Sequence, residues 1–406
     1  MIILELLAIL ELAWLLRWPA RAVGLPSVIG EMLTGFLLGP TLLGAFAPQV
    51  FHAAFPPEGI REVGELATLI VTAYCFMIGL EFDPTRLSGR SSALAITSLA
   101  CALFPAVAGY YAAGAMAARM GAPTPASFNL AVSLCFSATA FPVLLRIVED
   151  AGMTGQPVGI FSIGISAILE LLIWACLPVI LAIGTAGNPA QAGIVIAWVG
   201  GFLLAWFTVV RKGLEWLWKK IPIDGLVSLF YLACVGVVSA WLTDRLGIHA
   251  NFGAFVGGFV VPRSVSGTLA KKIKPACVFL LPVFFAAAGL KTTLALGNQG
   301  EVILLLAITI LAYTVKAFGT ALAARLTSGL DWNNSLTVEH LMCAKGAIGF
   351  AIIETCLSAG LLDSHGYSML AFVILANTIM AAWGVRLQRW RAGGFQKTTQ
   401  RRAVPA

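Results

Sequence analysis

The sequence predicts an all-α membrane protein with about 13 transmembrane helices, and three observations support this fold class. Of the 406 residues, 59% are hydrophobic and only 11% are charged, an apolar excess that no soluble domain needs. Apolar stretches of about 17–25 residues, the length of a helix that crosses a bilayer, recur along the whole chain. Lysine and arginine are concentrated in alternate loops. These features argue against a soluble protein.

The apolar stretches give the predicted helices in order. Their approximate boundaries are 2–18, 27–45, 63–82, 92–117, 127–147, 158–184, 191–211, 225–243, 249–262, 276–292, 301–324, 338–361 and 366–387. The first stretch carries Glu5 and Glu11 and lacks a basic flank, so we interpret it as a retained helix rather than a cleaved signal peptide. Residues 1–387 are expected to form one transmembrane domain, followed by a short basic tail at 388–406.

The positive charges predict the orientation of these helices. The loops after odd-numbered stretches, with the C-terminal tail, hold 20 of the 26 Lys and Arg residues, and the loops after even-numbered stretches hold 4. The basic side of a multi-pass protein is the cytoplasmic side. We therefore expect a bacterial inner-membrane protein with its N-terminus outside and its C-terminus in the cytoplasm. This asymmetry explains the net charge of +7 without a nucleic-acid partner.

Two pairs of motifs indicate an internal repeat. Gly30–Pro40 (GEMLTGFLLGP) matches Gly253–Pro262 (GAFVGGFVVP), and one helix later Phe76–Glu81 (FMIGLE) matches Ala286–Lys291 (AAAGLK). The copies lie seven stretches apart, so they enter the membrane from opposite sides. Inverted repeats of this kind are typical of secondary transporters, whose site lies between the repeats. The repeats are expected at about 2–184 and 225–387, with 191–211 as a linker helix.

A single carboxylate, Glu170, stands in an apolar stretch that has no other charge from Val158 to Ile183. Ser162 and Ser166 precede it at intervals of four, so the three polar side chains share one helix face. A carboxylate at bilayer depth is costly and is usually kept because something is bound or carried there. The stripe predicts part of an ion or proton path; the alternative is a protonated Glu in one interhelical hydrogen bond.

The fifth stretch is expected to break near its middle. Pro142 has no N–H to give the carbonyl of Ala138, so the helix should open there. Ser137 and Thr139 would then lie beside free backbone carbonyls. An ordinary structural proline kink is the alternative.

The twelfth stretch should be interrupted at the corresponding place in the second repeat. Gly346 and Gly349 weaken the helix there, and Lys345 lies beside them at membrane depth. A second lysine, Lys316, lies too centrally in the eleventh stretch to reach the membrane surface. A buried ammonium needs a partner, and Glu170 is the best carboxylate available for Lys316.

Together these motifs resemble those of the monovalent cation/proton antiporter superfamily. The branch that they resemble most is that of bacterial sodium/proton exchangers and Kef-type potassium/proton antiporters. The resemblance rests on Leu25–Pro40, Met77–Glu81, the Ser-Ala-Thr-Ala break and Phe284–Leu290, and it covers about residues 5–387. It implies a homodimer of 13-helix subunits, each with a dimer domain and a core domain that slides like an elevator and carries two crossed broken helices. No Kef-type cytosolic regulatory domain is recognisable in the sequence.

The resemblance also implies roles for individual residues. Glu170 aligns with the family's membrane carboxylate, and Ser137, Thr139 and Ser166 would supply further oxygen ligands for a cation or proton. Lys316 and Lys345 would compensate charge, and Ala138, Pro142, Gly346 and Gly349 would form the breaks. One departure is Leu169, which stands where the family usually has a polar residue beside the carboxylate. Another is Lys345-Gly346-Ala347 in place of Arg-Gly-Glu.

No metal site, cofactor motif or catalytic motif is recognisable, so we expect no cofactor and no enzymatic activity. Three hypotheses for function remain. The first is exchange of Na⁺ or K⁺ for H⁺, with Glu170 as the shared site and no net charge moved. The second is proton-coupled export of an organic solute, which Leu169 and the aromatic residues Phe136, Phe141 and Trp174 would suit. The third is a transport-inactive sensor or scaffold.

Overall fold

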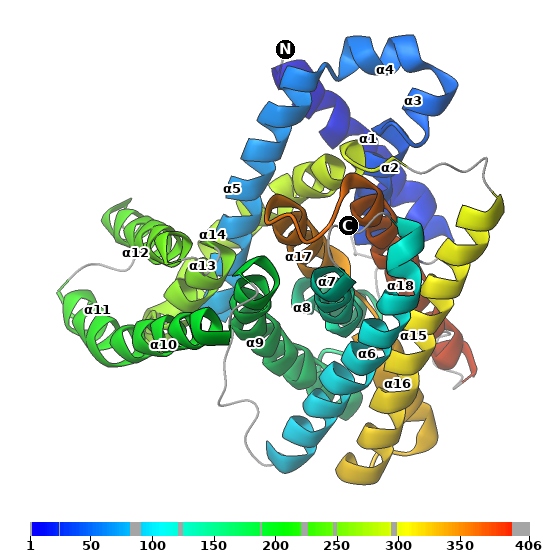
Figure 1. The fold of residues 1–406 in the computed structure, drawn as a ribbon. Helices are drawn as coiled ribbons and strands as arrows, with labels where there is room; N and C mark the ends of the chain where they lie inside the picture. The colour runs from blue at the N-terminus through cyan, green and yellow to red at the C-terminus, as the bar shows by residue number, and fades with distance from the viewer. Residues whose placement is uncertain are drawn as a thin grey trace, which may run out of the picture.

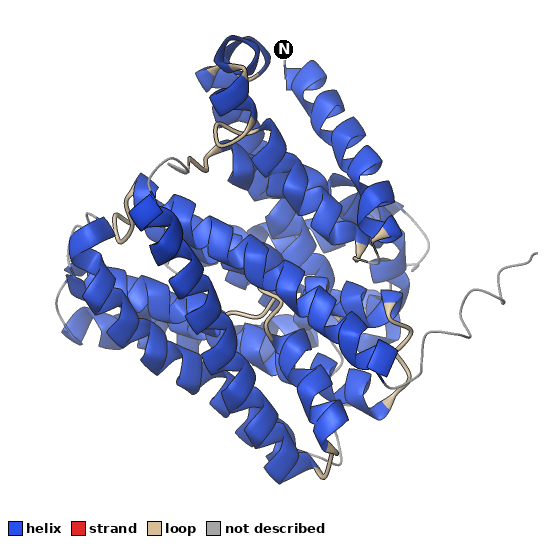
Figure 2. Cartoon of the chain, turned by 90° about the vertical axis from the view of Figure 1, so that its right-hand side faces the viewer, coloured by secondary structure: helices blue, strands red, loops and turns tan. Residues whose placement is uncertain are grey.

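The described part of the chain is helical, and the computed structural model contains no strand in that part (Figure 2). It describes residues 2–23, 25–81, 91–120, 125–186, 189–220, 226–246, 250–293 and 299–391. Nine helices within these ranges are long and apolar enough to cross a membrane. The predicted all-α membrane fold class is thus confirmed. Most of the basic tail predicted at 388–406 lies outside the described residues, which end at Arg391.

The first half of the chain contains helices α1 to α9 (Figure 1). In order these are α1 (Ile2–Ala22), α2 (Ser27–Leu38), α3 (Leu43–Phe46), α4 (Pro48–Ala54), α5 (Pro57–Glu81), α6 (Ser91–Met120), α7 (Pro125–Ser137), α8 (Phe141–Asp150) and α9 (Pro157–Ala186). The short helices α3 and α4 lie in the connection between α2 and α5. The predicted second helix, 27–45, thus ends earlier, at Leu38, and its last residues belong to α3, whereas α4 lies where no helix was predicted.

The second half repeats this order after a linker. The linker consists of α10 (Pro189–Ala205), the π-helical turn η2 (Trp206–Val210) and α11 (Arg211–Trp218). The repeat consists of α12 (Leu226–Arg245), α13 (Ala250–Phe259), α14 (Arg263–Leu290), α15 (Gln299–Ser328), α16 (Trp332–Met342), α17 (Gly346–Ser358) and α18 (Ser364–Arg391). Helix α14 begins well before the predicted residue 276. Its lysines lower the hydropathy of the first turns without interrupting the helix.

The repeat motifs mark the places where helix backbones touch. A Cβ on Gly258 of α13 would collide with the carbonyl oxygen of Phe76 on α5, and a Cβ on Gly289 of α14 would collide with the backbone of Gly35 on α2. Gly35 corresponds to Gly258 in the motif alignment, and Gly79 corresponds to Gly289. The contact of α5 with α13 is thus the pseudo-symmetric counterpart of the contact of α14 with α2. The inverted repeat therefore brings the two halves together through the same small residues.

Both predicted breaks are present, and they meet in the interior. Helix α7 ends at Ser137 and α8 begins at Phe141, while α16 ends at Met342 and α17 begins at Gly346. The backbone N–H of Ala140 in the first break donates to the carbonyl of Ala344 in the second, at 2.8 Å. The four half-helices therefore end or begin around one crossing point.

The residues predicted to cause the breaks contribute unequally. Pro142 is the second residue of α8. An N–H at this position has no acceptor within the helix, so the proline costs no helical hydrogen bond. Gly346 has φ of +39°, a conformation that favours glycine, and a Cβ there would collide with Val143. The prediction was wrong for Gly349, which lies inside α17, where its N–H donates to the carbonyl of Lys345 at 3.1 Å. It provides close packing against Ile374 instead.

The glycine crossings yield a stability prediction. Gly258→Ala should lower the thermal stability of the detergent-solubilised protein, because α5 and α13 would have to separate, at a cost of about 1–3 kcal/mol. The matched control is Gly201→Ala on α10, where a Cβ would meet nothing within 4 Å. That change should leave stability unaltered or raise it slightly. Equal melting temperatures for the two variants would contradict this account of the repeat motifs.

Candidate functional site

Glu170 lies on α9 and is only 2% exposed. Its carboxyl group faces the backbone N–H of Phe141, the first residue of α8, and the indole of Trp174 lies close to it. Among the described residues, Oε2 of Glu170 accepts no hydrogen bond of ordinary geometry. The positive end of the α8 dipole favours a negative charge at this position. The site thus combines a favourable helix terminus with a carboxyl oxygen that is available to a ligand.

A narrow cavity borders this carboxyl group, with room for about one water molecule. Its walls come from α5, α9 and α17 and consist of Val71, Tyr74, Cys75, Ile78, Glu170, Trp174, Ala347, Ile348 and Ala351. The sequence did not predict Tyr74, which is one of the few polar side chains of this wall. Its position two residues before the Phe76–Glu81 motif was the available signal.

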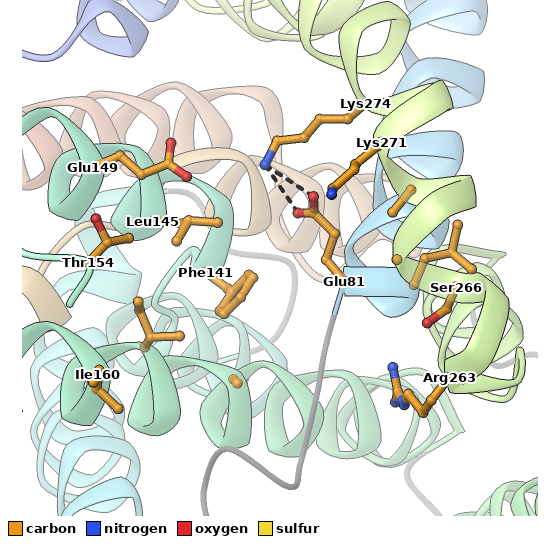
Figure 3. A pocket seen from close by; sticks show the side chains of 15 residues that line it. Glu81, Phe141, Leu145, Glu149, Thr154, Ile160, Arg263, Ser266, Lys271 and Lys274 are labelled. Carbon is orange, nitrogen blue, oxygen red and sulfur yellow. Dashed lines mark hydrogen bonds and ion pairs between the residues drawn. The ribbon is translucent and has the colours of Figure 1, made fainter.

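A wider vestibule lies beside Phe141, the first residue of α8 (Figure 3). It consists of adjoining cavities of about 500 and 220 Å³, which share Glu81, Phe141, Leu145, Glu149 and Lys274. Phe141 lines both cavities, and its backbone N–H faces Glu170. Tyr74 and Ile78 line both the smaller of these two cavities and the narrow cavity beside Glu170, so the vestibule adjoins that cavity.

The two membrane lysines bind backbone carbonyls at the end of α7. Nζ of Lys345 donates to the carbonyls of Cys135 and Phe136 at 2.9 and 2.6 Å, and Nζ of Lys316 donates to those of Ser137 and Ala138 at 2.6 and 2.8 Å. Both side chains are fully buried. The last carbonyls of a helix have no intrahelical donor, and cations stabilise that negative end. The lysines therefore supply what the interrupted helix lacks.

The predicted pair between Lys316 and Glu170 does not form. The interrupted helix offers Lys316 two carbonyl oxygens at hydrogen-bonding distance. The carboxyl group of Glu170, by contrast, faces the first N–H of α8, on the other side of the break. Two neutral acceptors with partial negative charge thus replace the expected carboxylate. Sequence reasoning could identify a buried ammonium that needed a partner, but not that the backbone would provide it.

The hydroxyl groups predicted as ligands lie near the crossing but donate elsewhere. Ser137 donates to the carbonyls of Ala102 and Ser133, and Thr139 donates to that of Met342 at 2.6 Å. Ser166, one turn before Glu170, donates to the carbonyl of Ile163. None of the three side chains lines the cavity beside Glu170. Each oxygen keeps lone pairs, so a role as ligand stays a prediction.

Further ion pairs connect helices near the vestibule. Glu31 of α2 is fully buried and accepts from Arg146 of α8 at 2.9 and 3.0 Å and from Arg17 of α1 at 3.1 Å. Because it has two arginines, Glu31 keeps a partner if one of them moves away.

Within the described residues no group of three or more His, Cys, Asp or Glu side chains could hold a metal ion.

Comparison with known proteins places this arrangement in a family. The family model described as the transmembrane sodium/hydrogen exchanger matches residues 7–387. The chain belongs to the sodium/hydrogen exchanger family. This is a family of transporters rather than enzymes, and its assignment confirms the resemblance to monovalent cation/proton antiporters.

Individual relatives agree with this assignment. The chain is 29% identical to Cation/H⁺ antiporter 17 of Arabidopsis thaliana, over 94% of this chain and 47% of that protein. It is 27% identical to the Na⁺/H⁺ antiporter NhaS4 of Synechocystis, over 89% of this chain and 92% of the relative. The chain therefore spans about half the length of the first relative and nearly all of the second.

A solved structure shares the fold of this family member. The sodium proton antiporter MjNhaP1 from Methanocaldococcus jannaschii aligns with a TM-score of 0.68 over 97% of both chains, at 16% identity. At that identity the match supports the fold alone. The inverted repeats and the crossed half-helices of this chain thus belong to a known membrane architecture.

The lysine contacts yield a second prediction. Lys345→Met should lower thermal stability strongly, because the carbonyls of Cys135 and Phe136 would be buried without a donor, at about 1–3 kcal/mol each. Lys212→Met on the exposed surface of α11 is the control and should change little. Melting in detergent, followed by tryptophan fluorescence, measures both. If Lys345→Met melted with the wild type, the capping role would be refuted.

Proposed function

We propose that this protein is a proton-coupled antiporter that exchanges a monovalent cation, Na⁺ or K⁺, for H⁺ across the plasma membrane. The observation that carries the proposal is the buried carboxyl group of Glu170, which faces the start of α8 and lines a small cavity. Membership of the sodium/hydrogen exchanger family, whose members similar to this chain include a Na⁺/H⁺ and a K⁺/H⁺ antiporter, supports the same conclusion.

Competition at Glu170 accounts for the exchange. One carboxylate can hold a proton or a cation but not both, so release of one permits binding of the other. The carboxyl oxygen available to a ligand and the neighbouring Tyr74 hydroxyl are oxygen ligands of the kind that a hard cation prefers. Leu169 contributes no oxygen beside Glu170. Water molecules and the hydroxyls of Ser137, Thr139 and Ser166 are the further ligands that we propose, after local rearrangement.

The vestibule supports an inward-facing state. It lies beside the ends of α5 and α8 and the beginning of α14, with Arg263, Lys271 and Lys274 in its walls. Because these positive charges belong to the side that the loop charges assign to the cytoplasm, the vestibule would open inward. The N-terminus would then be outside and the end of α18 in the cytoplasm.

Two groups of helices suit an elevator mechanism. Helices α1, α2, α5, α13 and α14 pack against one another, as do α6, α7, α15, α16 and α18 (Figure 1). We assign the first group to a dimer domain that is fixed in a homodimer. The second group, with α8, α9 and α17, would be the core domain that carries Glu170 from one side of the membrane to the other.

Lys316 can also change its protonation without losing its contacts. An ammonium group has three N–H donors and a neutral amine has two, and Lys316 uses two with the carbonyls of Ser137 and Ala138. The hydrogen bonds to α7 would therefore survive loss of a proton. In the simplest cycle Lys316 keeps its proton, and only Glu170 exchanges one proton for one cation.

The role of Glu170 is tested by Glu170→Gln. This variant should lose cation-dependent collapse of an imposed pH gradient in proteoliposomes, because an amide can neither release a proton nor balance a cation. Folding should be retained, as judged by melting and gel filtration. Glu215→Gln removes a carboxylate from an exposed ion pair with Arg211 on α11 and should transport normally. Full exchange by Glu170→Gln under sodium or potassium would rule out the proposed site.

The charge balance is tested by imposing a membrane potential. One proton exchanged for one cation moves no net charge, so the potential, about 2.3 kcal/mol per charge per 100 mV, should neither drive nor oppose the cycle. A potassium-selective ionophore sets the potential while sodium is the transported cation. Leu169→Asp adds a second acid and should introduce a dependence on potential. A wild-type rate that rises steeply with potential would assign Lys316 as a second proton carrier.

A further inference from the structure

One ion pair joins the two groups of helices at the end opposite the vestibule. Lys291, directly after α14, donates from Nζ to Oε1 of Glu354 on α17 at 2.6 Å. Both side chains are about one third exposed. They border a small cavity with Tyr367 and Phe350. The pair thus connects a helix of the proposed dimer domain to a half-helix of the proposed core domain.

The inverted repeat defines the counterpart of this pair at the vestibule. Lys291 ends its repeat motif at the position where Glu81 ends the first copy, directly after the matched Gly-Leu. Glu354 is the ninth residue of α17, and Glu149 is the ninth residue of α8. The counterpart of the Lys291–Glu354 pair is therefore Glu81 with Glu149. These are two carboxylates, which repel each other unless a cation lies between them.

Lys274 is placed to be that cation. Its Nζ lies 3.1 Å from Oε1 and 3.4 Å from Oε2 of Glu81, in the wall of the vestibule. Figure 3 shows Glu149 on the opposite wall, with its carboxyl group directed toward Lys274. The open vestibule lies between them. An ammonium group has three donors, so it can bind both carboxylates once α8 approaches α5 and α14.

We propose that these two clusters are reciprocal gates of the transport cycle. The Lys291–Glu354 pair holds the outer end closed while the vestibule is open. When the vestibule closes, Lys274 binds Glu149 as well as Glu81, and the Lys291–Glu354 pair separates. This inference rests on the proposed alternating-access function. It adds the residues that balance the two states.

The two carboxylates provide a matched test. Glu354→Gln removes a contact of the inward-facing state only, and Glu149→Gln removes a contact of the outward-facing state only. The apparent affinity at each face scales with the population of the state that is open to that face. In everted and right-side-out vesicles, Glu354→Gln should raise the ratio of inner to outer KM for the cation about threefold, as expected for a partly exposed ion pair. Glu149→Gln should lower that ratio by a similar factor.

Two further variants separate gating from damage. The double variant Glu149→Gln/Glu354→Gln should return the KM ratio toward that of the wild type, and the exchange Lys291→Glu/Glu354→Lys should restore it as well. The control is Glu65→Gln, which breaks an exposed ion pair with Arg61 within α5 and should leave the ratio unchanged. Equal ratios in the wild type and both single variants, or shifts in the same direction, would overturn the proposal.

A second measurement does not depend on transport. Leu145→Cys introduces a thiol into the vestibule wall. In everted vesicles, a membrane-impermeant maleimide should label this cysteine more slowly beside Glu354→Gln than beside Glu149→Gln, after subtraction of the labelling of the parent chain. Equal labelling would refute the gates even if exchange is intact. Absence of exchange with the predicted labelling order would instead refute the proposed function and leave the gates standing.

Discussion

The structure depends on one constraint, which is that a helix interrupted within a membrane must find partners for its exposed backbone groups. In lipid each unsatisfied N–H or C=O costs several kcal/mol, so irregular backbone is tolerated only where other parts of the protein bind it. Here Lys345 and Lys316 bind the carbonyls at the end of α7, and the hydroxyl of Thr378 accepts from the N–H groups of Lys345 and Gly346. Ala140 and Ala344 then join the two breaks directly.

This arrangement determines the electrostatics of the site. The two lysines donate to carbonyls at the end of α7, whereas the carboxyl group of Glu170 faces the N–H end of α8. The break thus separates positive side chains from the negative one, and each lies at the helix terminus whose dipole favours it. In the proposed exchange, a proton or cation at Glu170 would neutralise a charge that neither lysine neutralises.

The pseudo-symmetry of the two halves is close in the backbone and incomplete in the side chains. Glycine pairs place α5 against α13 and α2 against α14 in equivalent ways. The ends of α5 and α14, however, carry Glu81 and Lys291, which are opposite charges at equivalent positions. At one end Lys291 forms an ion pair across the helix groups, and at the other a vestibule separates Glu149 from Lys274. The same fold is thus closed at one end and open at the other.

The sequence by itself determined the helical membrane class, the inverted repeats, the two breaks and Glu170 as the central carboxylate. These follow from local chemistry: apolar length, paired small-residue motifs, a proline or glycine within a span, and one isolated charge. The tertiary structure alone decided the partners. Lys316 binds backbone carbonyls rather than Glu170, the Ser137 hydroxyl donates to Ala102 of α6, and the Thr139 hydroxyl donates across the crossing to Met342. Tyr74 joins the cavity beside Glu170. Partners are set by which helix faces meet in three dimensions, and no spacing within one helix contains that information.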